Sequence, residues 1–130
     1  MKKVTLIYPE EKDEHTLIVT LDLDECLKKL HHEITYDGDL LDRYEVDGGQ
    51  GRRVVVSIYE RYYIRAGNRL TVTLTMDNFT GKTRVHWRSG GGSDSVLFNF
   101  DWGAADHFDG LIKKTLSPYI DITEKGSKKE

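Results

Sequence analysis

Residues 52–77 of the chain read RRVVVSIYERYYIRAGNRLTVTLTMD, and this stretch decides which fold the sequence predicts. β-Branched and aromatic residues dominate residues 52–65, and apolar residues alternate with threonine over residues 68–77. Both patterns are typical of β-strands, because successive side chains of a strand point to opposite faces. The segment AGN at residues 66–68 suits a three-residue turn, so the two strands are predicted to form an antiparallel hairpin.

The predicted register of this hairpin assigns one of its faces to the core. Directly opposed residues share a side of the sheet, and pairing Ile64 with Leu70 brings the apolar residues of both strands to one face. That face comprises Val54, Val56, Ile58, Glu60, Tyr62, Ile64, Leu70, Val72, Leu74 and Met76. The opposite face is predicted to carry arginine, tyrosine and threonine side chains.

Further strands are predicted on both sides of the hairpin. They cover residues 4–8, 15–21, 40–46, 83–89 and 95–100, where aliphatic, β-branched and aromatic residues cluster. Together with the hairpin, they predict an antiparallel sheet of about five or six strands.

Two helices are predicted, one early in the chain and one near its end. Leu23, Leu27, Leu30 and Ile34 recur at helical spacing, and Asp22 or Asp24 supplies an N-cap. The second helix is predicted to start at Asp101 or Gly103, and Pro118, which lacks the N–H that a helix needs, is predicted to end or kink it near residues 115–117. The element order predicts one α+β domain over residues 1–123, with both helices packed on one face of a curved sheet, followed by a flexible charged tail at 124–130.

The composition restricts the class of protein. Of the 130 residues, 32% are charged, and no apolar run approaches the roughly 18 residues of a membrane-spanning helix. The basic start at residues 1–3 precedes too short an apolar stretch to predict a signal peptide. The single cysteine, Cys26, cannot form an internal disulfide. The sequence therefore predicts a cytoplasmic protein.

The charge is distributed unevenly along the chain. All eight arginines lie within residues 43–88, where eight Arg and one Lys stand against four acidic residues, a net charge of +5. Residues 1–42 carry five Lys against eleven acidic residues, a net charge of −6. This acidic first third makes nucleic acid an improbable partner, since nucleic-acid-binding domains are strongly basic.

Three consecutive glycines, Gly90 to Gly92, invite comparison with phosphate-binding loops. They follow a predicted strand and precede another, whereas a dinucleotide-binding loop leads into a helix. The sequence GKT at residues 81–83 lacks the glycine five positions earlier that a P-loop requires, since Met76 occupies it. The glycines are therefore interpreted as a bend, with an anion-binding nest of backbone N–H groups as the alternative.

Glu60 is the one carboxylate on the predicted core face. A desolvated carboxylate there would act as an acid or base, or anchor a ligand in a pocket under the C-terminal helix. The predicted lining of that pocket is Glu60, Tyr62, Trp87 and Trp102. Two structural interpretations stand beside it and are favoured: a bulge that turns Glu60 outward, or a pair with an arginine or a tyrosine hydroxyl.

The other face of the predicted sheet is a candidate surface for anions or for a protein partner. Its predicted members are Tyr59, Arg61, Tyr63, Arg65, Arg84, His86 and Arg88. Arginines interleaved with aromatic residues suit phosphate groups or acidic partners. The same residues also suit the solvated side of an antiparallel sheet, and this interpretation is preferred.

The sequence predicts no metal site, no cofactor and no catalytic residue. His31 and His32 are adjacent and would diverge on a helix, while His15, His86 and His107 fall on separate elements without a recognisable ligand spacing. Cys26 lies beside the apolar stripe of the first helix and is predicted to be a small buried residue.

Three motifs carry a resemblance: IYERYYIRAGNR at residues 58–69, SGGG at 89–92 and LFNFDWGAADHF at 97–108. They resemble a family of small uncharacterised bacterial proteins, mostly from Firmicutes, and the resemblance covers about residues 17–120. It implies a bacterial cytosolic domain and no known activity. The predicted architecture is also similar to helix-grip domains, in which a C-terminal helix closes a curved sheet over a cavity.

Three functions follow, in this order. The first is a non-enzymatic module that binds a small apolar or amphipathic molecule between the sheet and the C-terminal helix. The second is a protein-interaction or self-association module, a homodimer or the binder of an acidic partner, that uses the arginine and tyrosine face. The third is an enzyme with Glu60 as acid or base, which ranks last because no second catalytic group is predicted beside it.

Overall fold

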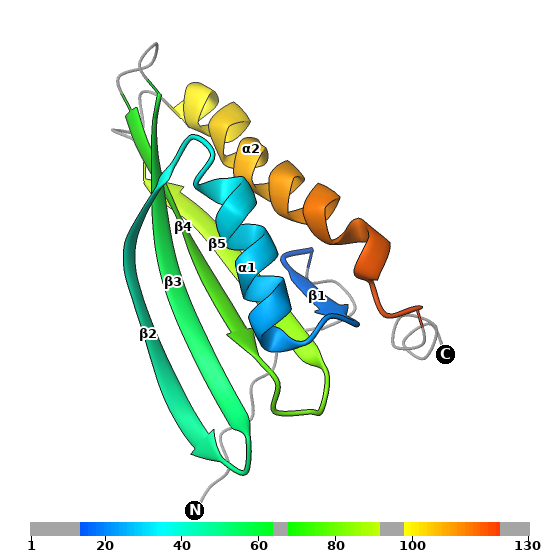
Figure 1. The fold of residues 1–130 in the computed structure, drawn as a ribbon. Helices are drawn as coiled ribbons and strands as arrows, with labels where there is room; N and C mark the ends of the chain where they lie inside the picture. Colours follow the sequence, from blue (N-terminus) through cyan, green and yellow to red (C-terminus); the bar gives the residue numbers. More distant parts are fainter. Residues whose placement is uncertain (1–13, 64–67, 92–97, 123–130) are drawn as a thin grey trace, which may run out of the picture.

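The structure is a computed structural model that describes residues 14–63, 68–91 and 98–122 (Figure 1). Strands and helices follow one another as an α+β fold. The elements are β1 (Thr16–Val19), α1 (Leu23–Ile34), β2 (Asp39–Gly49), β3 (Arg52–Tyr63), β4 (Asn68–Asp77), β5 (Thr83–Gly91), α2 (Phe98–Leu116) and a short 3₁₀ helix, η3 (Ser117–Tyr119).

The described strands form one open antiparallel sheet of five strands in the order β1-β5-β4-β3-β2. Strands β2 to β5 are a meander, and β1 pairs with β5 at the far edge, so β1 and β2 are the edge strands. Both helices cover the same face of the sheet (Figure 1). We call this the helix face and the opposite one the outer face. The predicted α+β fold, with an early and a C-terminal helix on one face, is confirmed.

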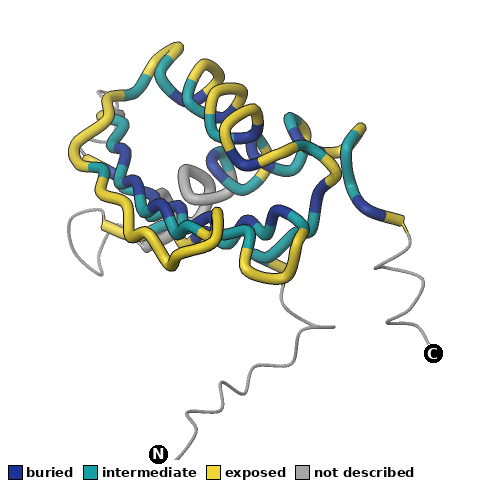
Figure 2. Tube along the Cα trace, turned by 60° about the horizontal axis from the view of Figure 1, so that its bottom comes forward, coloured by how far each residue is buried: buried dark blue, intermediate teal, exposed yellow. Residues whose placement is uncertain are grey.

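The core lies between the helices and the middle of the sheet. In β4, Leu70, Val72, Leu74 and Met76 alternate with threonines and are at most 1% exposed. Leu23, Cys26, Leu30 and Ile34 of α1 and Phe108, Ile112 and Leu116 of α2 pack onto them. Figure 2 shows the buried segments where the helices face the sheet. The apolar faces that result from helical and from strand periodicity thus pack together in one layer.

The boundaries of several elements differ from the prediction. The predicted strand at residues 95–100 is wrong where it is described, because α2 already begins at Phe98. The predicted strand at residues 4–8 lies outside the described residues. The first helix begins directly after Asp22, whose carboxylate accepts a hydrogen bond from the backbone N–H of Glu25 at 2.9 Å. The second helix ends at Leu116, two residues before Pro118, as predicted.

The register of the central hairpin corrects the predicted assignment of its two faces. Leu70 pairs with Arg61, rather than with Ile64, so an even number of residues, 64–67, separates the two strands. Shifting a strand by an odd number of residues moves every side chain to the other face. Val54, Val56, Ile58, Glu60 and Tyr62 therefore lie on the outer face. The helix face of β3 instead carries Arg53, Val55, Ser57, Tyr59 and Arg61.

Gly91 supports the interpretation of the glycine stretch as a bend. It ends β5 with φ of +101°, and a Cβ there would lie 2.9 Å from the carbonyl oxygen of Arg69. Only glycine combines this left-handed conformation with so close an approach to another strand. Gly90 lies inside β5, where an added Cβ would meet nothing within 4 Å, and Gly92 lies outside the described residues.

Candidate functional site

The structure moves Glu60 away from the predicted pocket. Its carboxylate lies on the outer face, and Nη1 of Arg69 is 3.3 Å from both of its oxygens. Tyr62 lies beside it, 52% exposed, with the guanidinium of Arg69 over its ring. The predicted burial of Glu60 in the core is wrong, and the ion pair with an arginine matches one of the two structural interpretations.

Trp87, one of the two tryptophans of the predicted pocket, does not join Glu60. Trp87 is fully buried on the helix face, and its indole N–H donates to Asp109 of α2 at 2.9 Å. The side chain of Trp102 lies outside the described residues. Phe108 and Ile112 of α2 pack directly against the sheet, so the described half of this helix rests on apolar side chains.

The arginine and tyrosine face predicted from the sequence is divided between the two sides of the sheet. Tyr59 and Arg61 belong to the helix face, and Tyr59 is fully buried. Its members on the outer face are Arg84, His86 and Arg88. The side chain of Tyr63 and the whole of Arg65 lie outside the described residues. The structure therefore does not bring the predicted set together.

A groove runs between α1 and the end of α2 on the side of the helices turned away from the sheet. It has a volume of about 560 Å³. Its lining comprises Lys28, Lys29, His32, Glu33, Leu111, Lys114, Thr115, Pro118 and Tyr119. The apolar stripe of α1 faces the sheet, so its polar residues face this groove. Pro118 belongs to the 3₁₀ turn after α2, and the next residue, Tyr119, lies against Lys29.

The groove is basic at its rim. The ammonium nitrogen of Lys29 is 5.4 Å from the centre of the Tyr119 ring. Within the described part of the chain, no carboxylate lies at ion-pair distance from Lys28, Lys29 or Lys114. Lys113, the neighbour of Lys114, is instead held by Asp109 at 3.3 Å. Three ammonium groups thus surround a partly apolar floor.

A second polar cluster lies beneath α1, between that helix and strands β2 and β3. Arg43 donates through Nε to the hydroxyl of Ser57 at 2.9 Å and through Nη2 to the hydroxyl of Tyr59 at 2.7 Å. The Tyr59 hydroxyl is also 3.0 Å from Nδ1 of His31. We call these four residues the α1 cluster. They tie the helix to the edge of the sheet.

The environment of the α1 cluster alters two ionisation equilibria. Burial lowers the pKa of His31, and the positive charge of Arg43 and the neighbouring His32 lower it further. Burial raises the pKa of Tyr59, against the opposing effect of Arg43. Both groups are therefore held neutral, and Arg43 carries the charge of the cluster.

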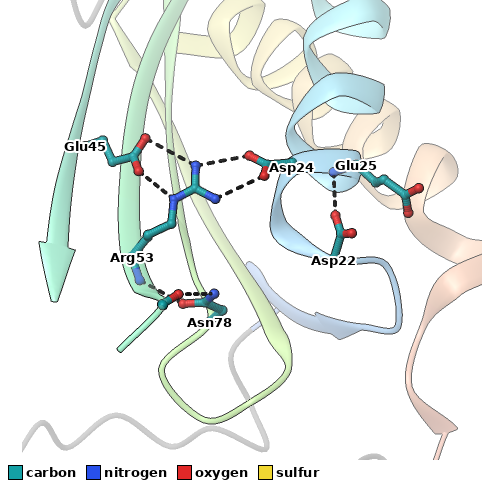
Figure 3. A network of polar contacts seen from close by, with 7 residues as sticks. Asp22, Asp24, Glu25, Glu45, Arg53 and Asn78 are labelled. Carbon is teal, nitrogen blue, oxygen red and sulfur yellow. Dashed lines mark hydrogen bonds and ion pairs between the residues drawn. The ribbon is translucent and has the colours of Figure 1, made fainter. Parts of the chain in front are cut away.

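Arg53 anchors the start of α1 to the far end of the β2–β3 hairpin (Figure 3). Its guanidinium lies between two carboxylates, 3.0 Å from Asp24 and 2.5 Å from Glu45. The hydrogen bond from Arg53 lowers the pKa of Glu45. Asn78 accepts a hydrogen bond from the backbone N–H of Arg53 at 2.8 Å and holds the same hairpin from the other side. This network is a structural anchor in which the positive charge of Arg53 is already neutralised.

Arg61, near the end of β3, makes a comparable bridge between Asp37 and helix α2. Its Nη2 is 3.0 Å from Asp37, and its Nη1 is 2.6 Å from Nε2 of His107 in α2. Burial and the charge of Arg61 lower the pKa of His107, while Asp37 raises it. Arg61 is thus paired with an acid inside the fold.

Two further expectations concern metals and thiol chemistry. Within the described residues, no group of three His, Cys, Asp or Glu side chains could hold a metal ion. Cys26 is buried as predicted, and burial raises its pKa to about 12, so the thiol stays protonated.

No helix in the described part of the chain has the length and apolar character that crossing a membrane requires.

Sequence reasoning did not single out the lysines of the groove or Arg43, and it assigned Tyr59 of the α1 cluster to a different site. The groove lysines could have been found, because Lys28 and Lys29 lie opposite the apolar stripe of a helix whose register was predicted. Arg43 gave a weaker signal as the one basic residue in a strand with Asp42 and Glu45. Its neutral partners are distant in sequence and become visible only in the fold.

Comparison with known proteins identifies a family. The sequence model of DUF6054, described as a family of unknown function, matches residues 13–120. No curated protein and no solved structure matches the chain.

Proposed function

This chain belongs to DUF6054, a family of unknown function, and on that premise we propose from its own residues that it is a binding module for a small amphipathic anion. The ligand lies in the groove between α1 and the end of α2. Its anionic head meets the lysines of the rim, and its apolar body rests on the floor. The module carries out no chemistry on the ligand.

The observation that carries this proposal is the set of three lysines around one groove that have no carboxylate partner among the described residues. Lys28 and Lys29 come from α1 and Lys114 comes from α2, so the charges converge from both walls. Like charges that converge without counterions repel one another, and a bound anion would relieve that repulsion. Glu33, on the same lining, offsets one of the three charges and leaves an excess of positive charge.

The floor of the groove supports an amphipathic ligand rather than a free inorganic ion. Leu111, Pro118 and the ring of Tyr119 supply apolar and aromatic surface. Small-molecule sites in proteins measure about 300–1,000 Å³ and combine apolar walls with a few polar groups. A carboxylate or phosphate attached to a short aliphatic or aromatic body matches this combination.

We assign the module to the bacterial cytoplasm as part of the same proposal. The motifs at residues 58–69 and 97–108 resemble small bacterial proteins, and the single cysteine suits a reducing compartment.

The test uses 8-anilinonaphthalene-1-sulfonate, an aromatic sulfonate, as the probe. Its fluorescence should report saturable binding to the native protein. The double variant Lys28→Gln/Lys114→Gln should bind it roughly two- to thirtyfold more weakly, since each of the two exposed ion pairs contributes about 0.2–1 kcal/mol. Lys113→Gln is the matched control and should bind like the native protein. Equal binding by the double variant, at unchanged thermal stability, would contradict the proposal.

Self-association remains the second candidate function, because one observation favours it. Tyr44 and Val46 are 56% and 50% exposed on the outer face, which neither helix covers. Native mass spectrometry of protein purified from its own host separates the two candidates. A monomer that retains a small ligand supports the binding module, and a ligand-free dimer supports self-association.

A further inference from the structure

Arg43 differs from the other partly buried arginines of the described fold in having only neutral partners. Its Nε and Nη2 donate to the hydroxyls of Ser57 and Tyr59, and Nη2 is also 3.4 Å from Nδ1 of His31. No carboxylate lies at ion-pair distance from it within the described residues. Arg53, by contrast, has two carboxylate partners.

The guanidinium of Arg43 has no counterion among the described residues, and a bound anion would stabilise it. Charged side chains that leave bulk water are ordinarily paired, because partial burial removes solvation that neutral hydrogen bonds restore only in part. The three neutral groups of the α1 cluster orient Arg43 but leave its positive charge uncompensated. The fold therefore holds a cation in place beneath α1 without supplying its counterion.

The tautomer of His31 provides a second donor in the same cluster. The Tyr59 hydroxyl accepts from Arg43 and lies 3.0 Å from Nδ1 of His31, within reach of a hydrogen bond from its own proton. Arg43 can only donate, so the contact between Nη2 and Nδ1 also requires a lone pair on Nδ1. The proton of the neutral imidazole therefore resides on Nε2.

Two nitrogens of the α1 cluster, which together carry three N–H bonds, remain open to solvent. Neither Nη1 of Arg43 nor Nε2 of His31 has a hydrogen-bond partner in the described residues. No buried side-chain nitrogen or oxygen of the described residues lacks a partner, so both nitrogens reach the surface. The inner side of the cluster is fully hydrogen-bonded, and its outward donors stay unused.

We propose that Arg43 and His31 form an oxyanion site, with a phosphate group as its ligand. Nη1 offers two N–H bonds and Nε2 offers a third, and a tetrahedral phosphate accepts from several directions at once. Ser57 and Tyr59 are positioning residues that hold Arg43 without touching the anion. The site is separate from the groove, because His31 faces Tyr59 and the sheet, while His32 faces the groove.

The experiment is a titration of the full chain with inorganic phosphate at constant ionic strength, read by ¹⁵N NMR of the histidine side chains. The native protein should show a saturable change at Nε2 of His31. The variant Arg43→Gln should bind phosphate at least tenfold more weakly. Arg69→Gln, which removes an arginine of the outer face, should respond like the native protein.

Two further variants and a second anion distinguish this site from the groove and from a carboxylate site. Lys28→Gln/Lys114→Gln should keep the phosphate response of His31, so a failure of the groove leaves this test intact. Arg43→Lys keeps a positive charge if Arg43→Gln does not fold, and it should weaken binding because it lacks the planar fork. An equal response to acetate would assign the site to carboxylates and overturn the choice of phosphate. No saturable change in the native protein would overturn the site itself.

Discussion

The hydroxyl of Tyr59 in β3 lies 3.0 Å from Nδ1 of His31 in α1, although 28 residues separate the two in the chain. This contact fastens the first helix to the sheet through a fully buried tyrosine. It also directs the histidine so that its other nitrogen points to solvent. One relationship between a core residue and a helix residue therefore links stability to the proposed oxyanion site.

Removing the Tyr59 hydroxyl tests whether its contacts stabilise the fold. Tyr59→Phe keeps the ring but takes one hydrogen-bond partner away from both Arg43 and His31, and a group left unsatisfied in this way costs about 1–3 kcal/mol. Urea unfolding should therefore show a loss of roughly that size. Tyr62→Phe, on the exposed outer face, is the control and should change stability by less than about 0.5 kcal/mol. Equal effects of the two substitutions would contradict the role of the hydroxyl.

Acidification should destabilise the fold between about pH 7.5 and about pH 5.5. Burial, Arg43 and His32 hold the pKa of His31 below its value in the unfolded chain. In this range the unfolded chain binds more protons than the folded one, so stability present above the unfolded pKa is lost as pH falls. His107, with its pKa lowered by burial and by Arg61, acts in the same direction.

Urea unfolding midpoints measured across this range give the slope. His31→Gln should reduce it, because the substituted side chain does not titrate. A midpoint that rises as the pH falls would show that the histidines are stabilised in their charged form and would contradict the sign.

Two adjacent valines test the register of the central hairpin. Val55 is 1% exposed on the helix face, whereas Val56 lies on the outer face. Val55→Asp buries an unpaired carboxylate and should abolish cooperative thermal unfolding. Val56→Asp should keep a cooperative transition. The reverse result would restore the register in which Val56 lies in the core.

Gly91 and Gly90 form a matched pair for the bend at the end of β5. Gly91→Ala forces a side chain into a left-handed conformation and against the carbonyl of Arg69, which should cost about 1–3 kcal/mol. Gly90→Ala has open space and should change stability by less than about 1 kcal/mol. Thermal unfolding of both variants measures the difference. A similar small effect at both positions would show that the bend does not depend on glycine.

Local patterns in the chain were sufficient for most of the secondary structure. The helical spacing of Leu23, Leu30 and Ile34 predicted α1, and the strict alternation of β4 predicted both the strand and its buried face. These elements were predictable because one face of each is consistently apolar. The strand predicted at residues 95–100 was wrong beyond Phe98, since short apolar runs do not distinguish a strand from a helix.

The face that β3 turns to the core was decided by the tertiary structure. Both of its alternating sets contain apolar residues, and the more apolar set, with Val54, Val56 and Ile58, lies on the outer face. Hydrophobic pattern alone therefore selects the wrong side. The pairing of Arg61 with Leu70 and the polar contacts of Tyr59 beneath α1 resolve the ambiguity.

The sequence by itself determined the α+β class, the positions of α1 and β4, and the absence of any standard phosphate-binding or metal-binding motif. The tertiary structure alone decided where the functional groups meet. Arg43 reaches Tyr59 across 16 residues and His31 across 12, and Lys28 meets Lys114 across a groove between two helices. Such meetings depend on strand register and helix docking, which are set by packing over the whole chain rather than by any local pattern of residues.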